Sequence, residues 1–308
     1  MSPLRQALVD YLAVRRALGF RLVRAEKLLG QLVGYLEARG EARLSIAAAL
    51  AWATLPGGVH RNWCAHRLSI VRGFAVHLRA IDPATEVPPA TLLPWRPCRA
   101  TPYLYSQADL VALLAAAGML RTPHRVATYQ VLVGLLAVTG MRVGEAMALD
   151  RGDFDPIADL LTIRKGKFGK SRELPLHADT GMALRSYLRR SDRPAPAAGS
   201  SALLVSTAGT RLRYSNVQCT FHRLVRRAGL MTRSASCRPR LHDLRHSFAV
   251  HTVLDGYRGG GDPQVRLPLL STYLGHVDPG RTYWYLSAAP ELLGLAGDRL
   301  ERHLGGVA

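Results

Sequence analysis

The spacing of apolar residues predicts a helical region at the N-terminal end of the chain. Over residues 22–36, leucine and valine recur every three to four positions, and this run ends before Gly40. Such spacing places the apolar side chains on one face of a helix. Two more helices are predicted over 44–54 and 59–80. We therefore expect a separate helical domain over residues 1–98.

A proline-rich stretch follows this helical region. Residues 82–102 contain six prolines and show little periodicity, which is typical of an extended and rather stiff linker. The sequence from Ser106 to Asp109 then resembles a capping signal for a helix over 110–117. A further helix is predicted over 124–138.

The second domain, expected over residues 103–308, combines two short strands with further helices. Apolar residues predict strands over 160–164 and 172–176, joined by a turn rich in glycine and lysine. The rest is predicted to be mainly helical, so the fold class is mainly α with a small β-sheet. Breaks in the helical pattern are predicted at 192–200, 232–240, 256–268 and 277–281.

The chain carries a large excess of positive charge. Its 308 residues include 41 Lys and Arg against 22 Asp and Glu, a formal net charge of +19, and 48% are hydrophobic. This hydrophobic content supports ordinary cores and excludes a disordered chain. Residues 1–100 carry 14 basic and 6 acidic side chains, and residues 101–308 carry 27 and 16. Because both domains are basic, nucleic-acid binding is favoured over the alternative, arginine-rich codon usage in a GC-rich genome.

Basic residues alternate with apolar ones in the helix predicted over 59–80. A solvated basic face and a surface that faces DNA both fit this pattern, and the charge of the whole domain slightly favours the second. The basic residues concerned are Arg61, His66, Arg67, Arg72 and Arg79.

The sequence shows no signal for export or for a membrane anchor. No apolar run approaches the roughly 18 residues that span a bilayer. Arg5 and Asp10 would interrupt the apolar part of a signal peptide. The four cysteines form no Cys-x-x-Cys pair, which suits thiols in a reducing compartment better than disulfides or zinc. A cytoplasmic protein, associated with the nucleoid through DNA, is expected.

Two segments place arginine close to another polar side chain on a helix. Arg142 and Glu145 are three residues apart, so the carboxylate can orient the guanidinium, although such a pair is more often a surface ion pair. His242 and Arg245 have the same spacing. His242 and His246 could also be metal ligands, but no third ligand is evident. A His/Arg pair that binds phosphate is favoured over zinc.

Lysine is concentrated in the turn between the two predicted strands. Three of the four lysines of the chain are Lys165, Lys167 and Lys170. Most such turns are simply solvated. Here arginine is used almost everywhere else, and only lysine can release a proton at accessible pH, so a proton donor is favoured.

An aromatic run follows another histidine-containing segment near the C-terminal end. His276 follows Gly275, and Tyr283 and Tyr285 lie a few residues further on. On a helix the two tyrosines would point to nearly opposite sides, so both cannot lie in the core. Aromatic clusters are more often packing than chemistry, and this segment alone is a weak signal.

Together these segments suit the cleavage of a phosphodiester bond. That reaction needs a nucleophile, cations at the two non-bridging oxygens and an acid for the departing 5′ oxygen. Arginine binds phosphate oxygens bidentately, and a tyrosine can be the nucleophile where cations stabilise its phenolate. No cluster of acidic residues that could hold Mg²⁺ is evident. We therefore expect neither a metal nor another cofactor.

The order of these motifs resembles the tyrosine recombinases, also called the phage integrase family. Each motif is weak alone, but the ordered set is specific, and the resemblance covers about residues 103–308. It implies an α+β tyrosine-recombinase catalytic domain there and a helical core-binding (DNA-binding) domain over 1–98. The loop over 254–268 is longer than the family pattern leads us to expect. The matching residues are Arg142, Lys167, His242, Arg245, His276 and Tyr285.

The resemblance implies a nucleophile and a general acid. Tyr285 would attack the scissile phosphate and form a 3′-phosphotyrosyl bond; it is chosen over Tyr283 because it lies nine residues after His276. Lys167 would protonate the departing 5′ hydroxyl, and it is chosen because it matches the lysine of the family's Gly-Lys turn.

The resemblance also implies how the phosphate is held. Arg142 and Arg245 would clamp it, His276 would hydrogen-bond to it, and His242 would assist proton transfer with the tyrosine. Glu145 would support Arg142. Two further residues are expected to be structural or to contact DNA: Arg172 and Asp243.

The implied function is site-specific DNA recombination that cleaves and rejoins strands for integration, excision or transposition of a mobile element. The implied partners are double-stranded DNA with specific recombination sites, a synaptic homotetramer in which the helix around 289–304 could pack on a neighbour, and companion recombinases. A type IB topoisomerase and a non-catalytic architectural DNA-binding protein of the same fold are the alternatives. No extra N-terminal arm-binding domain is evident, which favours a mobile-element or Xer-like enzyme.

Overall fold

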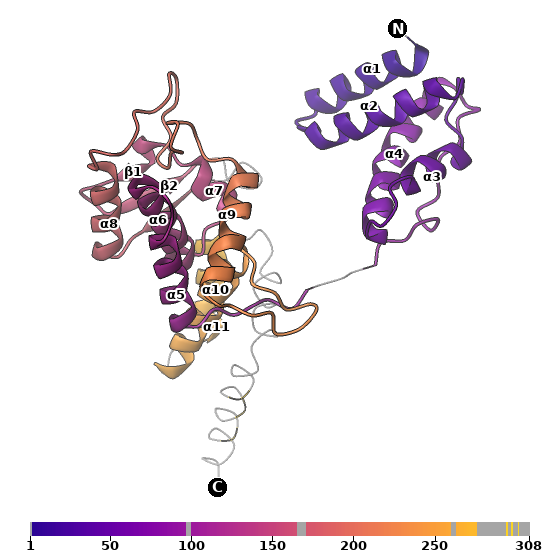
Figure 1. Cartoon of the computed structure of the whole chain (residues 1–308). Coiled ribbons are helices and arrows are strands. Elements are labelled where there is room, and N and C mark those ends of the chain that lie inside the picture. The colour runs from indigo at the N-terminus through magenta and orange to yellow at the C-terminus, as the bar shows by residue number, and fades with distance from the viewer. Residues whose placement is uncertain are drawn as a thin grey trace. The chain divides into compact units, whose positions relative to one another are not determined.

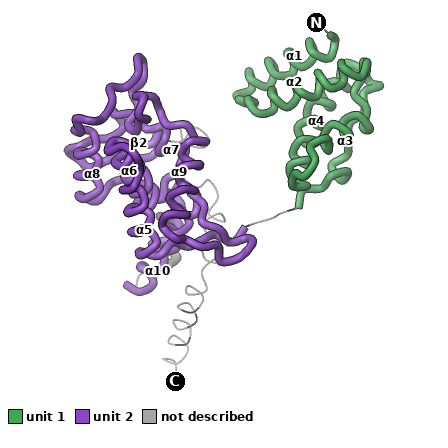
Figure 2. Tube along the Cα trace, in the orientation of Figure 1, with its two compact units in different colours: residues 1–99 green, residues 100–308 purple. Residues whose placement is uncertain are grey.

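The chain divides into two compact units, which are described separately. Unit 1 covers Met1–Arg99 and unit 2 covers Ala100–Ala308 (Figure 2). Their boundary falls inside the stretch 82–102 that the sequence predicts to be a linker. Within the described residues we find no helix with the length and hydrophobicity that a membrane span requires. This computed structural model describes residues 2–96, 100–164, 171–259 and 263–275, and the single residues 294, 297 and 301.

The described part of unit 1 is a group of helices around one core (Figure 1). The three helices predicted from apolar spacing are confirmed, with ends shifted by a few residues. Leu29, Leu32 and Leu36 are fully buried in one cluster with Phe74, as their spacing predicts. The helices are α1 (Pro3–Ala17), α2 (Val23–Ala38), α3 (Ile46–Thr54) and α4 (Arg61–Ile81).

The basic face predicted for α4 needs a correction. Arg67 is only 7% exposed, because its guanidinium donates to the backbone oxygen of Trp52 at 2.7 Å and stacks 3.8 Å above the indole ring. Arg72 donates to the backbone oxygens of Pro88 and Pro89. Arg67 therefore stabilises the core of unit 1 and is not on a surface that could face DNA.

Unit 2 is mainly helical and contains a small antiparallel sheet, so the predicted fold class is confirmed. Helix α6 contacts α5, α7, α8 and α10, and it therefore connects most of the helices in this unit (Figure 1). The helices are α5 (Gln107–Gly118), α6 (Pro123–Thr139), α7 (Val143–Ala148), α8 (Ala178–Leu188), α9 (Tyr214–Arg227), α10 (Asp243–Arg258) and α11 (Pro263–Leu274), with a 3-10 turn η1 (Arg151–Asp153).

Local sequence signals determine where α5 and α6 begin. At α5 the Ser106 side chain accepts from the Asp109 N–H, and the Asp109 carboxylate accepts from the Ser106 N–H, which confirms the predicted capping signal. At α6 the Thr122 hydroxyl accepts from the backbone N–H of Arg125. Pro123 is the first residue of α6, where a missing amide proton removes no helical hydrogen bond.

The sheet has the strand order β1-β2-β3, and both pairs are antiparallel. Leu161 lies opposite Leu174, and both are fully buried with Ile163 on the face that packs on the core. The sequence predicts β2 and β3 but not β1, which is too short to produce an alternating pattern. The strands are β1 (Phe154–Asp155), β2 (Leu160–Ile163) and β3 (Arg172–Pro175).

A break between two helices does fall inside the range 256–268, but the loop expected over 254–268 is too long. Helix α10 continues to Arg258, and α11 occupies the second half of the expected loop. The glycines and prolines of this segment favour a loop. Gly256 nevertheless lies inside α10, and a Cβ at this position would come within 2.8 Å of Cδ of Arg266 on α11. The packing of the two helices, which a local pattern does not reveal, therefore overrides the breaking signal.

Candidate active site

The turn after α6 positions Arg142. Gly140 ends the helix in the left-handed region at φ 58°, and its N–H donates to the backbone oxygen of Leu136 at 3.2 Å. A Cβ on Gly140 would clash with Cδ1 of Phe248 on α10, so only glycine permits this approach. The chain then turns at once into α7, and Arg142 is the residue before that helix rather than a residue inside it.

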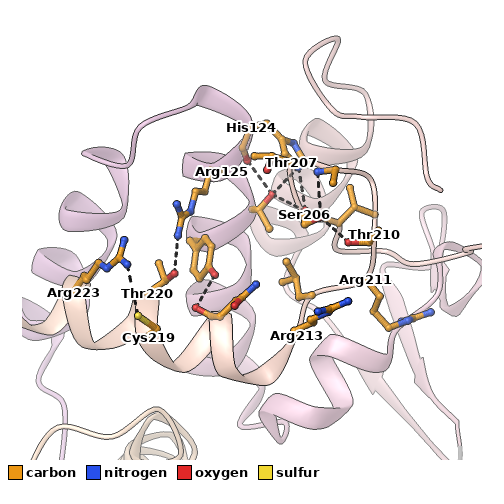
Figure 3. Close-up of a pocket in the computed structure, with 16 residues that line it drawn as sticks. His124, Arg125, Ser206, Thr207, Thr210, Arg211, Arg213, Cys219, Thr220 and Arg223 are labelled. Carbon is orange, nitrogen blue, oxygen red and sulfur yellow. Dashed lines mark hydrogen bonds between the residues drawn. The ribbon is translucent and has the colours of Figure 1, made fainter.

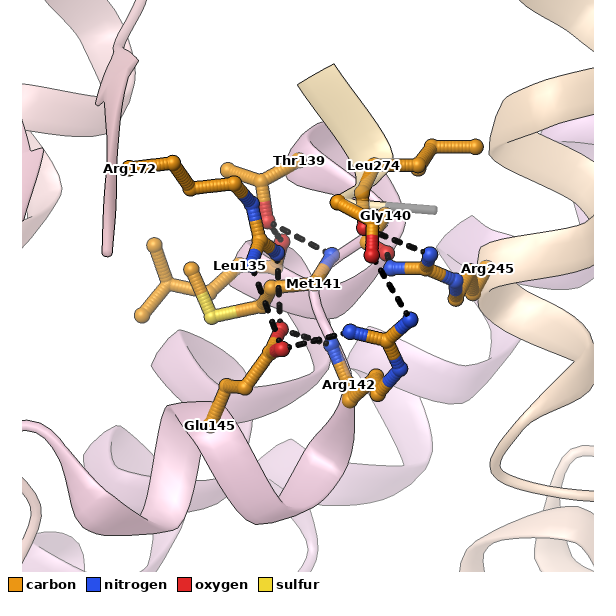
Figure 4. A network of polar contacts seen from close by, with 10 residues as sticks. Leu135, Thr139, Gly140, Met141, Arg142, Glu145, Arg172, Arg245 and Leu274 are labelled. Atoms are coloured by element: carbon orange, nitrogen blue, oxygen red, sulfur yellow. Dashed lines mark hydrogen bonds and ion pairs between the residues drawn. The ribbon is translucent and has the colours of Figure 1, made fainter. Parts of the chain in front are cut away.

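A single carboxylate holds two guanidinium groups in this site. The Glu145 Oε2 accepts from the Arg142 backbone N–H at 2.9 Å, and Oε1 accepts from Nη1 of Arg142 at 2.7 Å. Arg172, the first residue of β3, donates to both oxygens, with its Nη2 2.8 Å from Oε2 (Figure 4). Glu145 is 9% exposed, and burial opposes its charge, but Arg172 and Arg142 outweigh burial and lower the pKa of the carboxyl to about 2.

Arg245 is buried beside the same turn. Only 2% of it is exposed, and its guanidinium donates to the backbone oxygens of Gly140 and Leu274, each at 2.7 Å. Nη2 of Arg142 donates to the backbone oxygen of Gly275 at 3.3 Å. The two guanidinium groups therefore lie at the same pair of turns, one after α6 and one after α11 (Figure 4).

His242 completes the described part of this cluster. It directly precedes α10, and its ring lies 5.0 Å from the ring of His246, in an edge-on arrangement. Burial and the positive charges of Arg245 and Arg142 lower the pKa of His242 to about 4. The imidazole is therefore neutral near pH 7, and it can accept a proton.

The structure thus brings three of the six predicted site residues together: Arg142, His242 and Arg245. The other three, Lys167, His276 and Tyr285, lie outside the described residues. In the described part of the chain, no group of three His, Cys, Asp or Glu side chains could hold a metal ion. His242 and His246 therefore have no third ligand among those residues.

Arg172 is expected from the sequence to be structural or to contact DNA, and in the structure it makes a structural contact with Glu145. Its side chain is 14% exposed and shares Glu145 with Arg142. Arg172 also lies against the turn after α11, because a Cβ on Gly275 would come within 2.9 Å of its Nη1. The sequence shows a basic residue at the start of a strand that follows a lysine-rich turn. It does not show that the buried partner of this residue is Glu145, which lies on α7.

Asp243 supports the start of α10. It is 1% exposed, and Arg240 donates to it from Nε at 3.0 Å. Burial raises the pKa of Asp243, although the hydrogen bond from Arg240 acts in the opposite direction. The Ser247 hydroxyl donates to the Asp243 backbone oxygen at 2.9 Å and accepts from the Tyr105 N–H at 2.7 Å. The segment that precedes α5 is thereby attached to the helix that carries Arg245.

Arginine side chains gathered beside a histidine on a mainly helical domain suit the binding of a phosphate ester. Residues 106–291 match the model of the phage integrase family. A protein of Sinorhizobium fredii, whose name marks it as an integrase or recombinase, is 46% identical over 310 residues, which cover 98% of each chain. The tyrosine recombinase XerC of Mycobacterium leprae is 30% identical over 88% of this chain and 89% of its own. The chain belongs to the phage integrase family, and it is a tyrosine-type site-specific recombinase.

Solved structures share this fold. The integrase of the Tn1549 transposon, in complex with transposon right end DNA, has a TM-score of 0.63 at 16% identity, covering 98% of this chain and 99% of that one. A lambda integrase (75–356) dimer bound to a COC′ core site has a TM-score of 0.59 at 18% identity, covering 91% and 94%.

Proposed function

We propose that this chain cleaves and rejoins DNA strands at specific sites through a 3′-phosphotyrosyl intermediate on Tyr285. One observation carries the proposal. Arg142 lies about 100 residues before His242 and Arg245 in the sequence, yet the three side chains lie close together, at the turns after α6 and α11. Such a cluster suits a phosphodiester whose negative charge increases on its non-bridging oxygens during displacement.

Arg142 and Arg245 form the proposed phosphate clamp. Their partners in the site, backbone carbonyls for both and the Glu145 carboxylate for Arg142, hold each guanidinium in one orientation before the substrate binds. Because these groups are already oriented, they need no reorganisation when the transition state forms. Their stabilisation of the transition state therefore lowers the barrier. The side chain of Arg142 is 24% exposed, so part of it is open to a substrate.

His242 is the proposed acceptor of the Tyr285 proton. It is neutral near pH 7 because burial and the neighbouring guanidiniums disfavour its charged form. A bound phosphodiester brings negative charge into the same place, which raises the basicity of the imidazole when a proton has to be accepted. The proton acceptor is therefore strengthened by the substrate itself.

The remaining roles are those that the family resemblance implies, and the positions of the two residues in the chain are compatible with them. Lys167 lies five residues before Arg172, so a fully extended chain keeps it within roughly 17 Å of that anchored residue. His276 directly follows Gly275, whose backbone oxygen accepts from Arg142. We assign Lys167 as the acid for the 5′ oxygen and His276 as a further donor to the phosphate.

The reaction proceeds by exchange of one phosphate ester for another. The Tyr285 oxygen bonds to phosphorus, the bond from phosphorus to the 5′ oxygen breaks, and Lys167 gives a proton to that oxygen. A second 5′ hydroxyl then attacks the phosphotyrosine and releases Tyr285. Because an ester is formed for each ester broken, ligation needs no cofactor.

Double-stranded DNA is the proposed partner of both units. The net charge of +19 supports this, and solved structures of the same fold are complexes with DNA. Unit 1 is the proposed core-binding domain. We further propose a homotetramer on paired sites, with companion recombinases, in the movement of a mobile element.

The test is a covalent-adduct assay without divalent ions. Inverted repeats in the DNA that flanks the gene supply the substrate, a duplex nicked near the expected cleavage position. The wild type and Tyr283→Phe should form a protein–DNA adduct that survives denaturation, and Tyr285→Phe should not. An adduct with Tyr285→Phe would mean that the nucleophile is another residue. Relaxation of any supercoiled plasmid would indicate a topoisomerase, and binding without any adduct would indicate an architectural protein.

A further inference from the structure

A basic pocket lies at the end of α6 that is remote from the candidate active site. It has a volume of about 410 Å³ and lies between the first turns of α6, helix α9 and the turn that follows Val205 (Figure 3). None of its lining residues is acidic. The arginines that line it are Arg125, Arg211, Arg213 and Arg223.

Three of these arginines have no carboxylate partner among the residues that the structure describes. Arg125 donates to the hydroxyl of Thr220 at 2.8 Å, and the contact of Arg223 is the sulfur of Cys219 at 3.7 Å. Both acceptors are neutral, so these side chains keep their full positive charge. Arg213, the residue before α9, also has no ion pair among the described residues.

The fourth arginine of the pocket, Arg211, does have a carboxylate partner. Arg211 pairs with Asp150 and donates to the backbone oxygens of Met147 and Leu149 at the end of α7, so it has a structural role. Arg142 and Arg172 at the candidate active site likewise pair with a carboxylate, that of Glu145. The pocket therefore gathers three arginines around one cavity that has no acidic residue in its lining.

The N-terminus of α9 adds to the positive potential. Arg213 precedes the helix without a side-chain cap, and both Arg213 and Asn216 line the pocket. The first amides of a helix carry a partial positive charge that favours anions. Three guanidiniums and a helix N-terminus around one cavity fit a phosphate group.

We propose that this pocket binds a phosphate of the DNA backbone, roughly seven base pairs from the scissile phosphate. Arg125 and Gly140 are 15 residues apart on α6, which is about 23 Å at 1.5 Å per residue. A duplex that follows α6 covers that distance in about seven steps of 3.4 Å. The proposal rests on the proposed function, because that function makes DNA the partner.

A backbone phosphate fits better than a small phosphate metabolite. Arg213 and Arg223 are exposed and Arg125 is half-buried, so the cations form an open rim and not a closed cage. A phosphodiester lies on such a rim with its outer oxygens hydrated, and the rest of the duplex supplies the remaining contacts. Small ligands are usually held by a site that buries most of their surface.

The test measures how salt affects DNA binding. In the Tyr285→Phe background, which keeps the complex non-covalent, the affinity for a 30-bp duplex is measured over a KCl series. Arg213→Ala/Arg223→Ala should weaken binding roughly tenfold at 100 mM KCl and reduce the slope of log K against log salt by about one. The control is Arg121→Ala/Arg189→Ala, which removes the same charge from exposed positions outside the pocket. It should change affinity about twofold or less.

Two more measurements make the result decisive. Arg213→Lys/Arg223→Lys keeps the charge, so it should retain the wild-type slope, and this shows that the alanine variant fails through lost charge and not through misfolding. Equal losses in the pocket and control variants would overturn the proposal. A second result would also overturn it. If the alanine variant keeps the slope but loses a thermal stabilisation by inorganic phosphate that the unsubstituted pocket shows, the pocket is a small-anion site.

The two proposals can fail separately. If the wild type forms an adduct but the pocket variant has an unchanged salt slope, the proposed recombinase function is supported and the proposed DNA contact at the pocket is refuted. If the slope is reduced but no adduct forms, the DNA contact at the pocket is supported and the proposed cleavage chemistry is refuted.

Discussion

Glu145 is the residue on which the geometry of the described site depends most. One carboxylate joins Arg142, at the start of α7, to Arg172, at the start of β3. Burial alone would favour its neutral form, but the two guanidiniums reverse that preference. Near neutral pH the site therefore holds a negative charge that is hydrogen-bonded to two guanidiniums.

Removing this charge should impair cleavage more than DNA binding. Glu145→Gln keeps the shape of the side chain but turns an amide towards a guanidinium, so Arg142 loses its fixed orientation. We expect the rate of adduct formation to fall roughly 100-fold, the scale that a small misplacement of a catalytic group produces, with affinity changed less than about threefold. Glu173→Gln, on the exposed side of the same strand, is the control. Equal rates for the two variants would contradict the role of Glu145.

The same carboxylate predicts a pH-dependent stability. Its folded pKa of about 2 lies below the ordinary value of 4.5, so its contribution is complete above about pH 5 and is lost as the pH falls towards 2. Urea unfolding should show the wild type about 3 kcal/mol more stable than Glu145→Gln at pH 7, and this difference should shrink as the pH is lowered from 5 to 2. A difference that does not change with pH would exclude this electrostatic origin.

At the scale of elements, the turn between α6 and α7 connects the fold to the site. Gly140 ends α6, allows Phe248 of α10 to approach, and presents its backbone oxygen to Arg245. The close approach of α10 is what makes a glycine necessary at this position.

A methyl group at this position should be costly. Gly140→Ala combines a left-handed backbone with a clash against Phe248, and we expect a loss of about 2–4 kcal/mol in unfolding free energy. Gly134→Ala is the control, because a Cβ there meets nothing within 4 Å inside the same helix, and it should stabilise by about 0.5–1 kcal/mol. In a Phe248→Ala background the cost of Gly140→Ala should fall. If it stays the same, the clash is not the cause.

The sequence predicted the elements that have a strong local signal. Helices α2, α4 and α6 followed from apolar spacing, and α5 also from its capping residues. The short strand β1 and the continuation of α10 were missed, since both depend on packing partners that are distant in the chain. Periodicity reports which face of an element is apolar, and it does not report what that face meets.

The same distinction applies to the site. The pairing of Arg142 with Glu145 followed from a spacing of three residues, and the structure has it. The second partner, Arg172, lies 27 residues after Glu145, and only the fold brings it there. Arg67 shows the reverse case, because a residue expected on a basic surface is buried against Trp52.

At the scale of the whole molecule, charge is spread over both units. Residues 1–100 carry an excess of 8 positive charges, and residues 101–308 carry an excess of 11. A protein that contacts phosphates with both units should therefore release many counterions when it binds DNA.

This distribution predicts a strong dependence of binding on salt. If six or more phosphates are neutralised, the affinity of the Tyr285→Phe protein for a 30-bp duplex should fall by about a thousandfold or more between 50 and 200 mM KCl. Fluorescence anisotropy over a salt series measures this directly. A fall of less than tenfold would mean that only a small part of the basic surface contacts DNA.

The most direct test of the whole account is the identity of the residue that becomes linked to DNA. After cleavage of the nicked duplex in the presence of a chelator, the adduct is digested with trypsin and nuclease, and mass spectrometry locates the modified residue. We predict a single phosphotyrosyl linkage, at Tyr285, that is lost with Arg245→Ala. A linkage to any other residue, or one that forms equally well without Arg245, would contradict the claim that the cations gathered after α6 and α11 activate a phosphate for this tyrosine.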